Sequence, residues 1–327
     1  MSIQVRILLA ATVIVLFPVV LVAIVGLADR GLRAVLSFKA LQQTRPWIWI
    51  TPGLVFMGTV LVYPLLDTLR LSLHDASGRE YVGLENYAWI FTAPGVVDVL
   101  RNTAVWVTVI PLVTLLLGLV ASVLIDRVRY ESFAKSVLVM PTAISFVAAA
   151  VMWSLVFKFR PAGLPQRGTL NALWTLLGKE PITWTVNPST ANAALVFIVI
   201  WSYLGFVTIV LSAALKGIPD ELLDAARVDG ASEWQVFRYV TLHQLKPAVI
   251  VVTTTMVVWV LKTFDVVFVF TQGRYGTDII GVRVYNELFA ALNWGRGSAL
   301  ATMLFFAILP IMVINIRRLF STFGAST

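Results

Sequence analysis

The stretch Ala193–Leu215, AALVFIVIWSYLGFVTIVLSAAL, decides the class of fold because it contains no charged side chain. A helix needs about 20 apolar residues to cross the hydrocarbon core of a bilayer, which is about 30 Å thick. A strand of a membrane barrel would instead alternate polar and apolar residues over about ten positions. Ala193–Leu215 therefore predicts a membrane-spanning helix.

The composition of the whole 327-residue chain also indicates a protein that lies in a lipid bilayer. Hydrophobic residues make up 59% of the sequence and charged residues 13%, and the mean hydropathy is +0.87. An average soluble domain is about one quarter charged, and a soluble fold of this length cannot bury so much apolar surface. The composition therefore excludes an ordinary soluble enzyme.

Outward from Ala193–Leu215, further stretches are long and apolar enough to cross a bilayer. They are Ile7–Leu27, Ile48–Leu69, Ala104–Ile125, Ser136–Phe157, Ala248–Phe270 and Ser298–Ile316. We expect an all-α membrane protein with six core transmembrane helices and one extra N-terminal transmembrane helix. The extra helix and a basic linker occupy residues 1–45, and the core occupies residues 46–320.

The first stretch, Ile7–Leu27, raises the alternative of a cleaved signal peptide. Arg6 is the one basic residue before it, and no small-x-small cleavage site follows it. A signal peptide normally has a basic start, a shorter apolar run and such a site. We therefore expect a retained helix.

The basic side chains predict the orientation of the chain, because cytoplasmic loops are enriched in Lys and Arg. Alternate loops and the C-terminal end carry most of them: Arg30, Arg33, Lys39, Arg45, Arg127, Arg129, Lys135, Lys216, Arg227, Arg238, Lys246, Arg317 and Arg318. This pattern places the N-terminus outside and the C-terminus in the cytoplasm. It also accounts for the net charge of +8 without nucleic-acid binding.

One cytoplasmic loop, Gly217–Pro247, predicts two short helices rather than a simple tether. Pro219 suits the first position of a helix, and Gly230 suits its end. Ser232 and Gln235 have the spacing of a capping box that starts a second helix.

The same loop carries an apolar stripe beside small residues. Trp234, Phe237 and Val240 recur at helical spacing, and Ala225 and Ala226 allow another backbone to approach closely. These features favour a knob that docks into a groove of another protein. The alternative is a helix that lies flat on the membrane.

The pattern Asp224-Ala225-Ala226-x3-Gly230-x9-Val240-x-Leu242 resembles the signature loop of bacterial ABC-importer permeases. That loop reads Glu-Ala-Ala, three residues, Gly, nine residues and Ile-x-Leu-Pro, so Asp224 replaces Glu and His243 replaces Pro. The resemblance implies a type I permease fold. It also implies that the loop couples the chain to an ATPase, through Asp224, Ala225, Ala226, Asp229, Gly230, Trp234 and Phe237.

Other segments are similar to the carbohydrate branch of these permeases, which the maltose system typifies. They are Ser212–Pro219, Leu261–Asp265, Tyr81–Tyr87 and Asn293–Ala299. Within the branch, the chain looks most like permeases for α-glucosides and glucosylglycerol. The resemblance implies a bacterial inner-membrane location, a second permease subunit, two ATPase subunits and an extracytoplasmic sugar-binding protein.

The sequence predicts no cofactor or metal bound by this chain. It has no Gly-x4-Gly-Lys-Ser/Thr phosphate loop, so ATP and Mg²⁺ are expected on a partner ATPase. It has no cysteine, and its two histidines, His74 and His243, are far apart in sequence, which disfavours a metal site.

A charged side chain within a span indicates a functional site, and Lys262 and Asp265 lie three apart in the sixth span. We expect them to share a helix face, either as a structural ion pair or as the lining of a sugar pathway. The other residues predicted for this pathway are Trp259, Phe264, Tyr203, Trp201, Asn102, Ser145 and Trp153, and packing is the alternative role for each. Trp106 and Ser202 are further candidates.

Three other functions compete with sugar import. A permease of the same machinery for an amino acid or phosphate would favour an uncompensated basic lining, against which Asp265 argues. A membrane enzyme would need a cluster of carboxylates or histidines, and a secondary carrier would show inverted repeats without a docking loop. The sequence favours none of the three.

Overall fold

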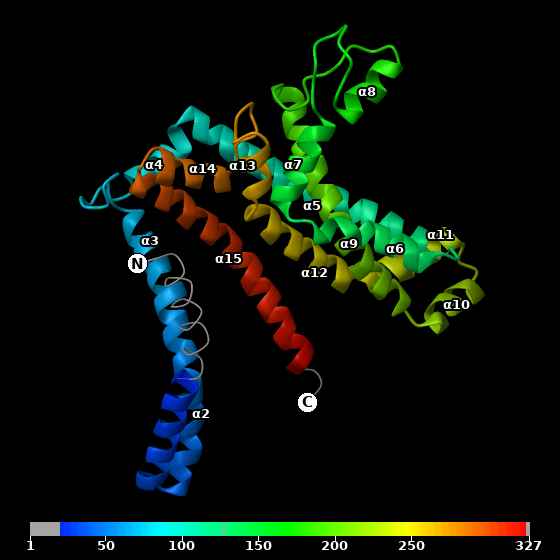
Figure 1. Ribbon diagram of the computed structural model, residues 1–327. Helices are drawn as coiled ribbons and strands as arrows, with labels where there is room; N and C mark the ends of the chain where they lie inside the picture. The colour runs from blue at the N-terminus through cyan, green and yellow to red at the C-terminus, as the bar shows by residue number, and fades with distance from the viewer. Residues whose placement is uncertain (1–19, 127, 325–327) are drawn as a thin grey trace. The chain divides into compact units, whose positions relative to one another are not determined.

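The computed structural model describes residues 20–126 and 128–324 of the chain (Figure 1). In these residues the secondary structure is helical, apart from an isolated antiparallel bridge between His74 and Tyr81. The chain divides into two compact units, Met1–Arg70 and Leu71–Thr327.

The first unit contains a helix over residues 20–35, α2 (Phe38–Met57), a π-helical turn (Gly58–Val62) and α3 (Tyr63–Leu71). Buried Asp29 pairs with Arg33 at 2.6 Å and with Arg45 at 3.1 Å, which ties the first helix to α2. Phe38–Leu71 is long and apolar enough to cross a membrane and contains the predicted span Ile48–Leu69. The predicted span Ile7–Leu27 lies mostly outside the described residues, so an extra N-terminal span stays a prediction.

The second unit holds the remaining helices. They are α4 (Glu85–Thr92), α5 (Pro94–Ile125), α6 (Glu131–Val139), α7 (Phe146–Val156), α8 (Thr169–Leu176), α9 (Pro188–Lys216), α10 (Asp220–Val228), α11 (Glu233–Gln235), α12 (Leu242–Leu261), α13 (Asp265–Phe270), α14 (Ile280–Tyr285) and α15 (Trp294–Gly324). A 3₁₀ turn (Met140–Ala143) follows α6, and π-helical turns follow α11 (Val236–Thr241) and α14 (Asn286–Ala290).

Within the described residues, five helices are long and apolar enough to span a membrane, or six if one bent pair counts as a span. Helices α5, α9 and α15 contain the predicted spans Ala104–Ile125, Ala193–Leu215 and Ser298–Ile316. The predicted span Ser136–Phe157 falls on this bent pair, in which α6 and α7 meet at an angle of 101°. Pro141 lacks the backbone N–H needed to continue the helix, and Ser145 caps the start of α7.

Helix α12 contains most of the predicted span Ala248–Phe270, but the expectation of one helix through Lys262 and Asp265 is wrong. Helix α12 ends at Leu261, and α13 begins at Asp265. Between them the backbone of Phe264 leaves the helical region, with φ −140° and ψ −56°. The sixth predicted span is therefore broken at the Lys262-Thr263-Phe264 segment.

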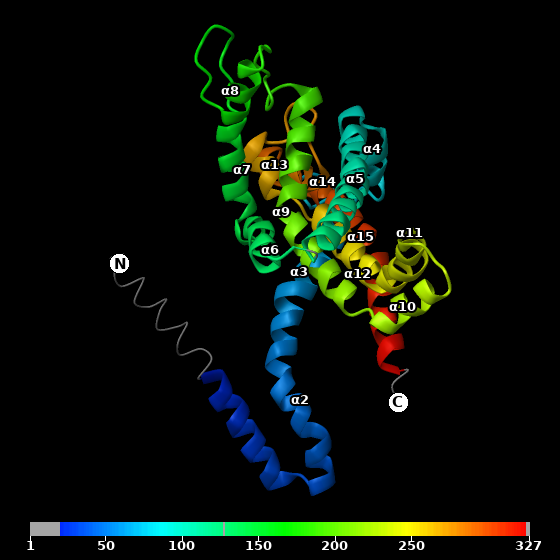
Figure 2. The ribbon, with the colours of Figure 1, turned by 90° about the vertical axis from the view of Figure 1, so that its right-hand side faces the viewer.

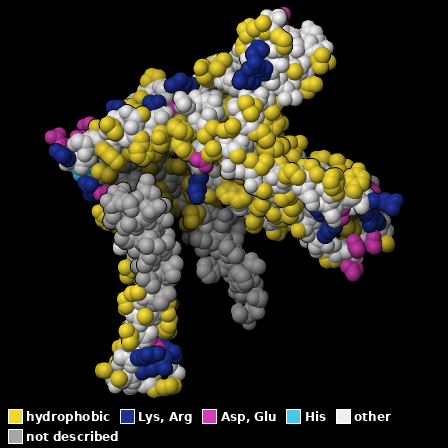
Figure 3. All heavy atoms as spheres, viewed as in Figure 1, with side chains coloured by type: hydrophobic (Ala, Val, Ile, Leu, Met, Phe, Trp, Pro, Cys, Tyr) yellow, Lys and Arg dark blue, Asp and Glu magenta, His cyan; other side chains and the backbone are white. Residues whose placement is uncertain are grey.

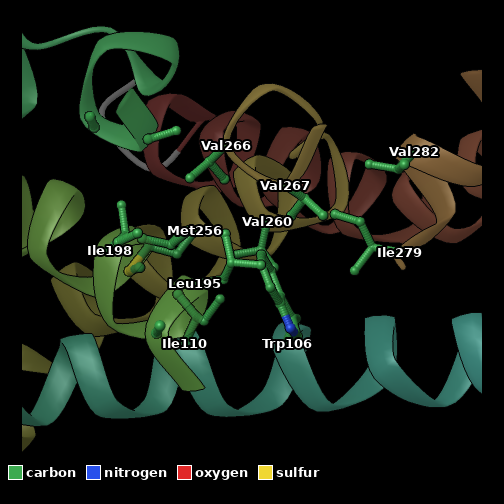
Figure 4. Close-up of a cluster of buried hydrophobic side chains, with 14 of the residues drawn as sticks. Trp106, Ile110, Leu195, Ile198, Met256, Val260, Val266, Val267, Ile279 and Val282 are labelled. Atoms are coloured by element: carbon green, nitrogen blue, oxygen red, sulfur yellow. The ribbon is translucent and has the colours of Figure 1, made fainter. Parts of the chain in front are cut away.

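A core of buried apolar side chains joins α5, α7, α9, α12 and α13 (Figure 4). Trp106, Leu195 and Met256 are almost fully buried in it. Helix α9 approaches the α6 backbone closely at Gly205, where a Cβ atom would lie 2.0 Å from the Leu138 carbonyl oxygen. This packing fixes α6 and α9 against each other beside the break at Pro141.

Hydrophobic side chains cover much of the outside of the second unit, as a lipid-facing surface requires (Figure 3). Charged side chains gather around α10 and α11. In Figures 1 and 2, α8 lies at one end of this unit and α10 with α11 at the other. The segments predicted to face opposite sides of the membrane therefore lie at opposite ends.

Candidate functional site

The loop Gly217–Pro247 forms two short helices that meet at a glycine corner. Helix α10 begins at Asp220, with Pro219 as its N-cap residue rather than its first residue, and Asp220 and Glu221 lie in its first turn. Acidic side chains there interact favourably with the positive end of the helix dipole. Gly230 follows with a φ of +85°, a conformation that glycine adopts without a steric cost.

The second helix of this loop begins with the predicted capping box. The backbone N–H and the hydroxyl of Ser232 both donate to Oε1 of Gln235, at 2.8 and 3.0 Å. Helix α11 then continues into a π-helical turn, which the sequence analysis did not predict. The start of this helix is thus specified by local hydrogen bonds.

Arg227 connects the two helices of the loop. Its guanidinium donates to Glu233 at 2.8 Å, beyond the corner, and to Asp224 at 2.9 Å within α10. These hydrogen bonds, the one to Glu233 first, raise the pKa of Arg227, so the side chain stays charged. The bridge therefore links α10 to α11 across Gly230.

The residues predicted to contact an ATPase lie largely on the exposed side of this corner. Asp224, Ala225, Asp229 and Gly230 are exposed, and Ala226 and Phe237 are partly buried. The Trp234 ring is 65% exposed and stacks on Phe237 with ring centroids 5.9 Å apart. Large exposed aromatic rings beside small residues are typical of a protein–protein contact.

A second candidate site lies where the two broken spans approach each other. It consists of a cavity of about 280 Å³ and a smaller one of about 160 Å³, which share Phe146, Tyr203 and Trp259 in their walls. The larger cavity reaches the α6–α7 break at Pro141 and Thr142. The smaller one reaches the α12–α13 break, from Lys262 to Asp265.

Aromatic rings form the main wall of this pocket. Tyr203 stacks on Trp259 with ring centroids 5.0 Å apart and an interplanar angle of 26°. Phe206 lies 4.8 Å from Trp259, and Phe146 meets Tyr203 edge-on at 5.3 Å. A few polar groups, including Ser202, Thr142 and Thr263, interrupt the aromatic wall. This mixture suits a ligand with both apolar faces and hydroxyl groups.

Lys262 and Asp265 both line the smaller cavity, but the expectation that they share a helix face is wrong. Because α12 ends at Leu261, the two residues lie on either side of a helix break. Among the described residues, neither forms an ion pair with the other, and both are exposed. A structural ion pair between them is therefore absent from this conformation.

The other predicted pathway residues, Trp153, Trp201, Asn102 and Ser145, do not line these two cavities. Trp153 and Trp201 meet edge-on at 5.4 Å in a separate aromatic cluster. Asn102 donates to the Asp278 carbonyl at 2.8 Å and accepts from Asn192 at 2.7 Å, inside the packed core. Ser145 accepts from the Ala148 N–H as the N-cap of α7.

Trp106 is a core residue rather than part of the pocket wall. Its indole N–H donates to Asn192 at 2.7 Å, and its side chain is 1% exposed. Sequence reasoning missed Phe146 and Phe206. The signal available for Phe146 was the helix-breaking Pro141 followed by the Ser145 cap, which together place the start of a new helix at the cavity.

The chain is similar in sequence to several transport proteins. It is 45% identical over 271 residues to the osmoprotective compounds uptake permease protein GgtC of Synechocystis sp., covering 83% of this chain and 97% of that protein. It is 38% identical over 289 residues to the alpha-glucoside transport system permease protein AglF of Rhizobium meliloti, covering 88% and 86%. These relatives support the resemblance to ABC-importer permeases.

The fold is also that of a known transporter subunit. The structure of a bacterial alginate ABC transporter in complex with alginate pentasaccharide-bound periplasmic protein contains a chain that matches with a TM-score of 0.73. The match covers 85% of this chain and 94% of that one at 19% identity, so it concerns the fold. Residues 114–322 match the family described as binding-protein-dependent transport system inner membrane component. The chain belongs to this family of membrane transport components.

Proposed function

We propose that this chain is a permease subunit of an ATP-driven importer that carries a sugar across the bacterial inner membrane by alternating access. The substrate we favour is an α-glucoside, a disaccharide or a glucosyl-polyol. The observation that carries this proposal is the aromatic pocket around Tyr203 and Trp259 at the two helix breaks. The relatives named for osmoprotective compounds and for alpha-glucoside support the same class of substrate.

The chemistry of the pocket favours a neutral, hydroxyl-rich ligand. The apolar face of a pyranose ring packs against aromatic side chains, while its hydroxyl groups need donors and acceptors such as Thr263, Lys262 and Asp265. The two charges compensate each other, whereas a pathway for phosphate would favour an excess of cations. The larger cavity, about 280 Å³, is close to the lower end of about 300 Å³ for ligand pockets, which favours a small sugar.

Coupling to ATP hydrolysis is assigned to the corner formed by α10 and α11. Arg227 bridges the two helices and the Ser232 cap starts the second one, so this corner between α9 and α12 is a structured element rather than a simple tether. A second permease, two ATPase subunits and an extracytoplasmic binding protein complete the proposed transporter. The N-terminus lies outside and the C-terminus in the cytoplasm.

The test of substrate class is uptake by cells of the source organism that lack this gene. We expect radiolabelled glucosylglycerol, trehalose or another α-glucoside to enter when the wild-type gene is restored and not otherwise. Radiolabelled phosphate and amino acids serve as comparison solutes. Restored uptake of phosphate or an amino acid, with no change for any sugar, would contradict the proposal and favour the non-sugar alternative.

A further inference from the structure

A groove of about 520 Å³ lies between α5 and the start of α12, and the proposed transport pathway does not use it. Its apolar lining residues are Leu115, Leu116 and Leu119 of α5 and Leu242 and Val249 of α12. Its polar lining residues are Arg238, Tyr239, His243 and Lys246. The groove thus combines a cationic rim with a hydrocarbon-like wall, and no acidic side chain lines it.

The cations of this rim differ from their neighbours at the same end of the unit. Lys135, Lys216 and Arg227 each form an ion pair with Asp or Glu. Among the described residues, Arg238 and Lys246 have no carboxylate within ion-pair distance. The Arg238 guanidinium instead lies 5.8 Å from the Tyr239 ring. Two cations beside an apolar wall are therefore available to an external anion.

The groove lies near the start of a candidate span that is longer than the hydrocarbon core requires. The candidate span Glu233–Leu261 has 29 residues, whereas about 20 cross the hydrocarbon core. Arg238 lies at the start of this span, among the residues in excess of the roughly 20 that cross the hydrocarbon core. Lys246 lies nearer the apolar part, from which its long side chain can reach the headgroup region. Leu116, 54% exposed, faces outward from α5.

We propose that this groove binds an anionic phospholipid of the cytoplasmic leaflet. The lipid phosphate contacts Arg238 and Lys246, the Tyr239 hydroxyl and the His243 imidazole lie at the headgroup level, and an acyl chain covers Leu115, Leu116 and Leu119. Basic pockets between transmembrane helices on the cytoplasmic side bind such headgroups. The inference rests on the proposed function for the side of the membrane on which α10 and α11 lie.

The test uses the full chain in nanodiscs with equal amounts of phosphatidylglycerol and phosphatidylcholine that carry the same acyl chains. Lipids retained after extraction are counted by native mass spectrometry. We expect the wild type to retain phosphatidylglycerol in preference to phosphatidylcholine. Each neutralised cation of the rim is expected to lower that preference about fivefold, so Arg238→Gln with Lys246→Gln should remove it.

Two matched variants serve as controls for this experiment. Lys158→Gln with Arg167→Gln removes the same charge from exposed positions before α8 and should retain the preference. Arg238→Lys with Lys246→Arg keeps both charges and should also retain it. Equal retention of both lipids by the wild type, or an equal loss in the Lys158 and Arg167 variant, would overturn the proposal.

The second permease is the competing occupant of this groove. If Arg238→Gln with Lys246→Gln released a co-purifying permease while lipid retention stayed unchanged, the groove would be a subunit interface and the lipid proposal would be wrong. The assay measures no transport. A failure of the lipid proposal therefore leaves the uptake test unaffected, and a failure of the uptake test leaves this assay interpretable.

Discussion

Tyr203 of α9 and Trp259 of α12 stack with their ring centroids 5.0 Å apart, although they come from different spans. Both rings line the two cavities at the helix breaks. The stacked pair therefore places an aromatic surface where the backbones of α6–α7 and α12–α13 are interrupted. If a sugar passes here, this surface is its main apolar contact.

Removing the Trp259 ring should weaken sugar uptake. Aromatic contacts contribute about 0.5–1.5 kcal/mol beyond the area they bury, so Trp259→Ala should raise the apparent KM for uptake about two- to tenfold. Trp259→Phe should retain most of the affinity. Trp47→Ala, which removes an exposed ring from the first unit, is the control. An unchanged KM in Trp259→Ala at normal abundance would show that the Trp259 ring does not contact the transported sugar.

Lys262 and Asp265 should tolerate single substitutions without loss of abundance. Removing one partner of a buried ion pair leaves a stranded charge and is strongly destabilising, but these two residues are exposed and form no pair. We expect Lys262→Met and Asp265→Leu to reach the membrane in normal amounts, as measured by immunoblot. The double variant should also be abundant, yet fail to take up sugar.

Lys135→Met supplies the contrasting control for this prediction. The Lys135 ammonium lies 3.1 Å from Asp126 and 2.6 Å from Glu131, so its loss leaves Asp126 without its cation, while Glu131 keeps Lys216, and should lower abundance. Poor abundance of both single variants at Lys262 and Asp265, restored in the double variant, would show that the two charges pair in the cell.

The ends of the second unit should face opposite sides of the membrane. Because the chain has no cysteine, Val228→Cys and Leu176→Cys each introduce a single thiol. Both positions are highly exposed, at 87% and 81%. A membrane-impermeant maleimide should label position 176 in intact cells. It should label position 228 only after the membrane has been permeabilised. The reverse pattern would overturn the orientation predicted from the basic residues.

Asp75 should stabilise the turn before α4 in a pH-dependent way. Its carboxylate accepts from the Ser77 hydroxyl and from the N–H groups of Arg79 and Glu80, which lowers its pKa to about 2. A lowered pKa means that this stabilisation is complete above the ordinary value of 3.8 and disappears as the pH falls through about 2.

Hydrogen exchange measured across pH 5 to pH 2 checks this prediction. Protection of the Arg79 and Glu80 amides should fall over the acidic part of that range in the wild type. In Asp75→Ala, which removes the acceptor oxygens, it should already be low at pH 5. Asp98→Asn, which alters an exposed carboxylate on α5, should behave like the wild type. Equal protection in Asp75→Ala and the wild type would contradict the role of the carboxylate.

The loop Gly217–Pro247 could be predicted from the sequence because its structure follows local rules. Ser232 and Gln235 specify a helix start, and Gly230 specifies a corner that other residues adopt at a steric cost. The long spans α5, α9 and α15 were predictable for a similar reason, since each is a single apolar run of sufficient length.

The pocket could not be predicted in the same way. The break at Lys262-Thr263-Phe264 contains neither proline nor glycine, so no local signal interrupts the apolar run there. Phe206 lines the cavity because α9 packs against α6 through Gly205, a contact between distant parts of the chain. Such positions depend on tertiary packing rather than on periodicity.

Sugar-stimulated ATP hydrolysis by the assembled transporter carrying Gly230→Val tests the central claim most directly. Gly230 has a φ of +85° and Gly163 a φ of +84°, and a Cβ at either position meets no atom within 4 Å. Valine costs about 1–2 kcal/mol in this conformation, so Gly163→Val, before α8, is a matched control for strain. We predict that both variants reach the membrane, that Gly163→Val retains stimulation by sugar-loaded binding protein, and that Gly230→Val loses it. Normal stimulation in Gly230→Val would contradict the account, because the corner between α10 and α11 would then not couple ATP hydrolysis to transport.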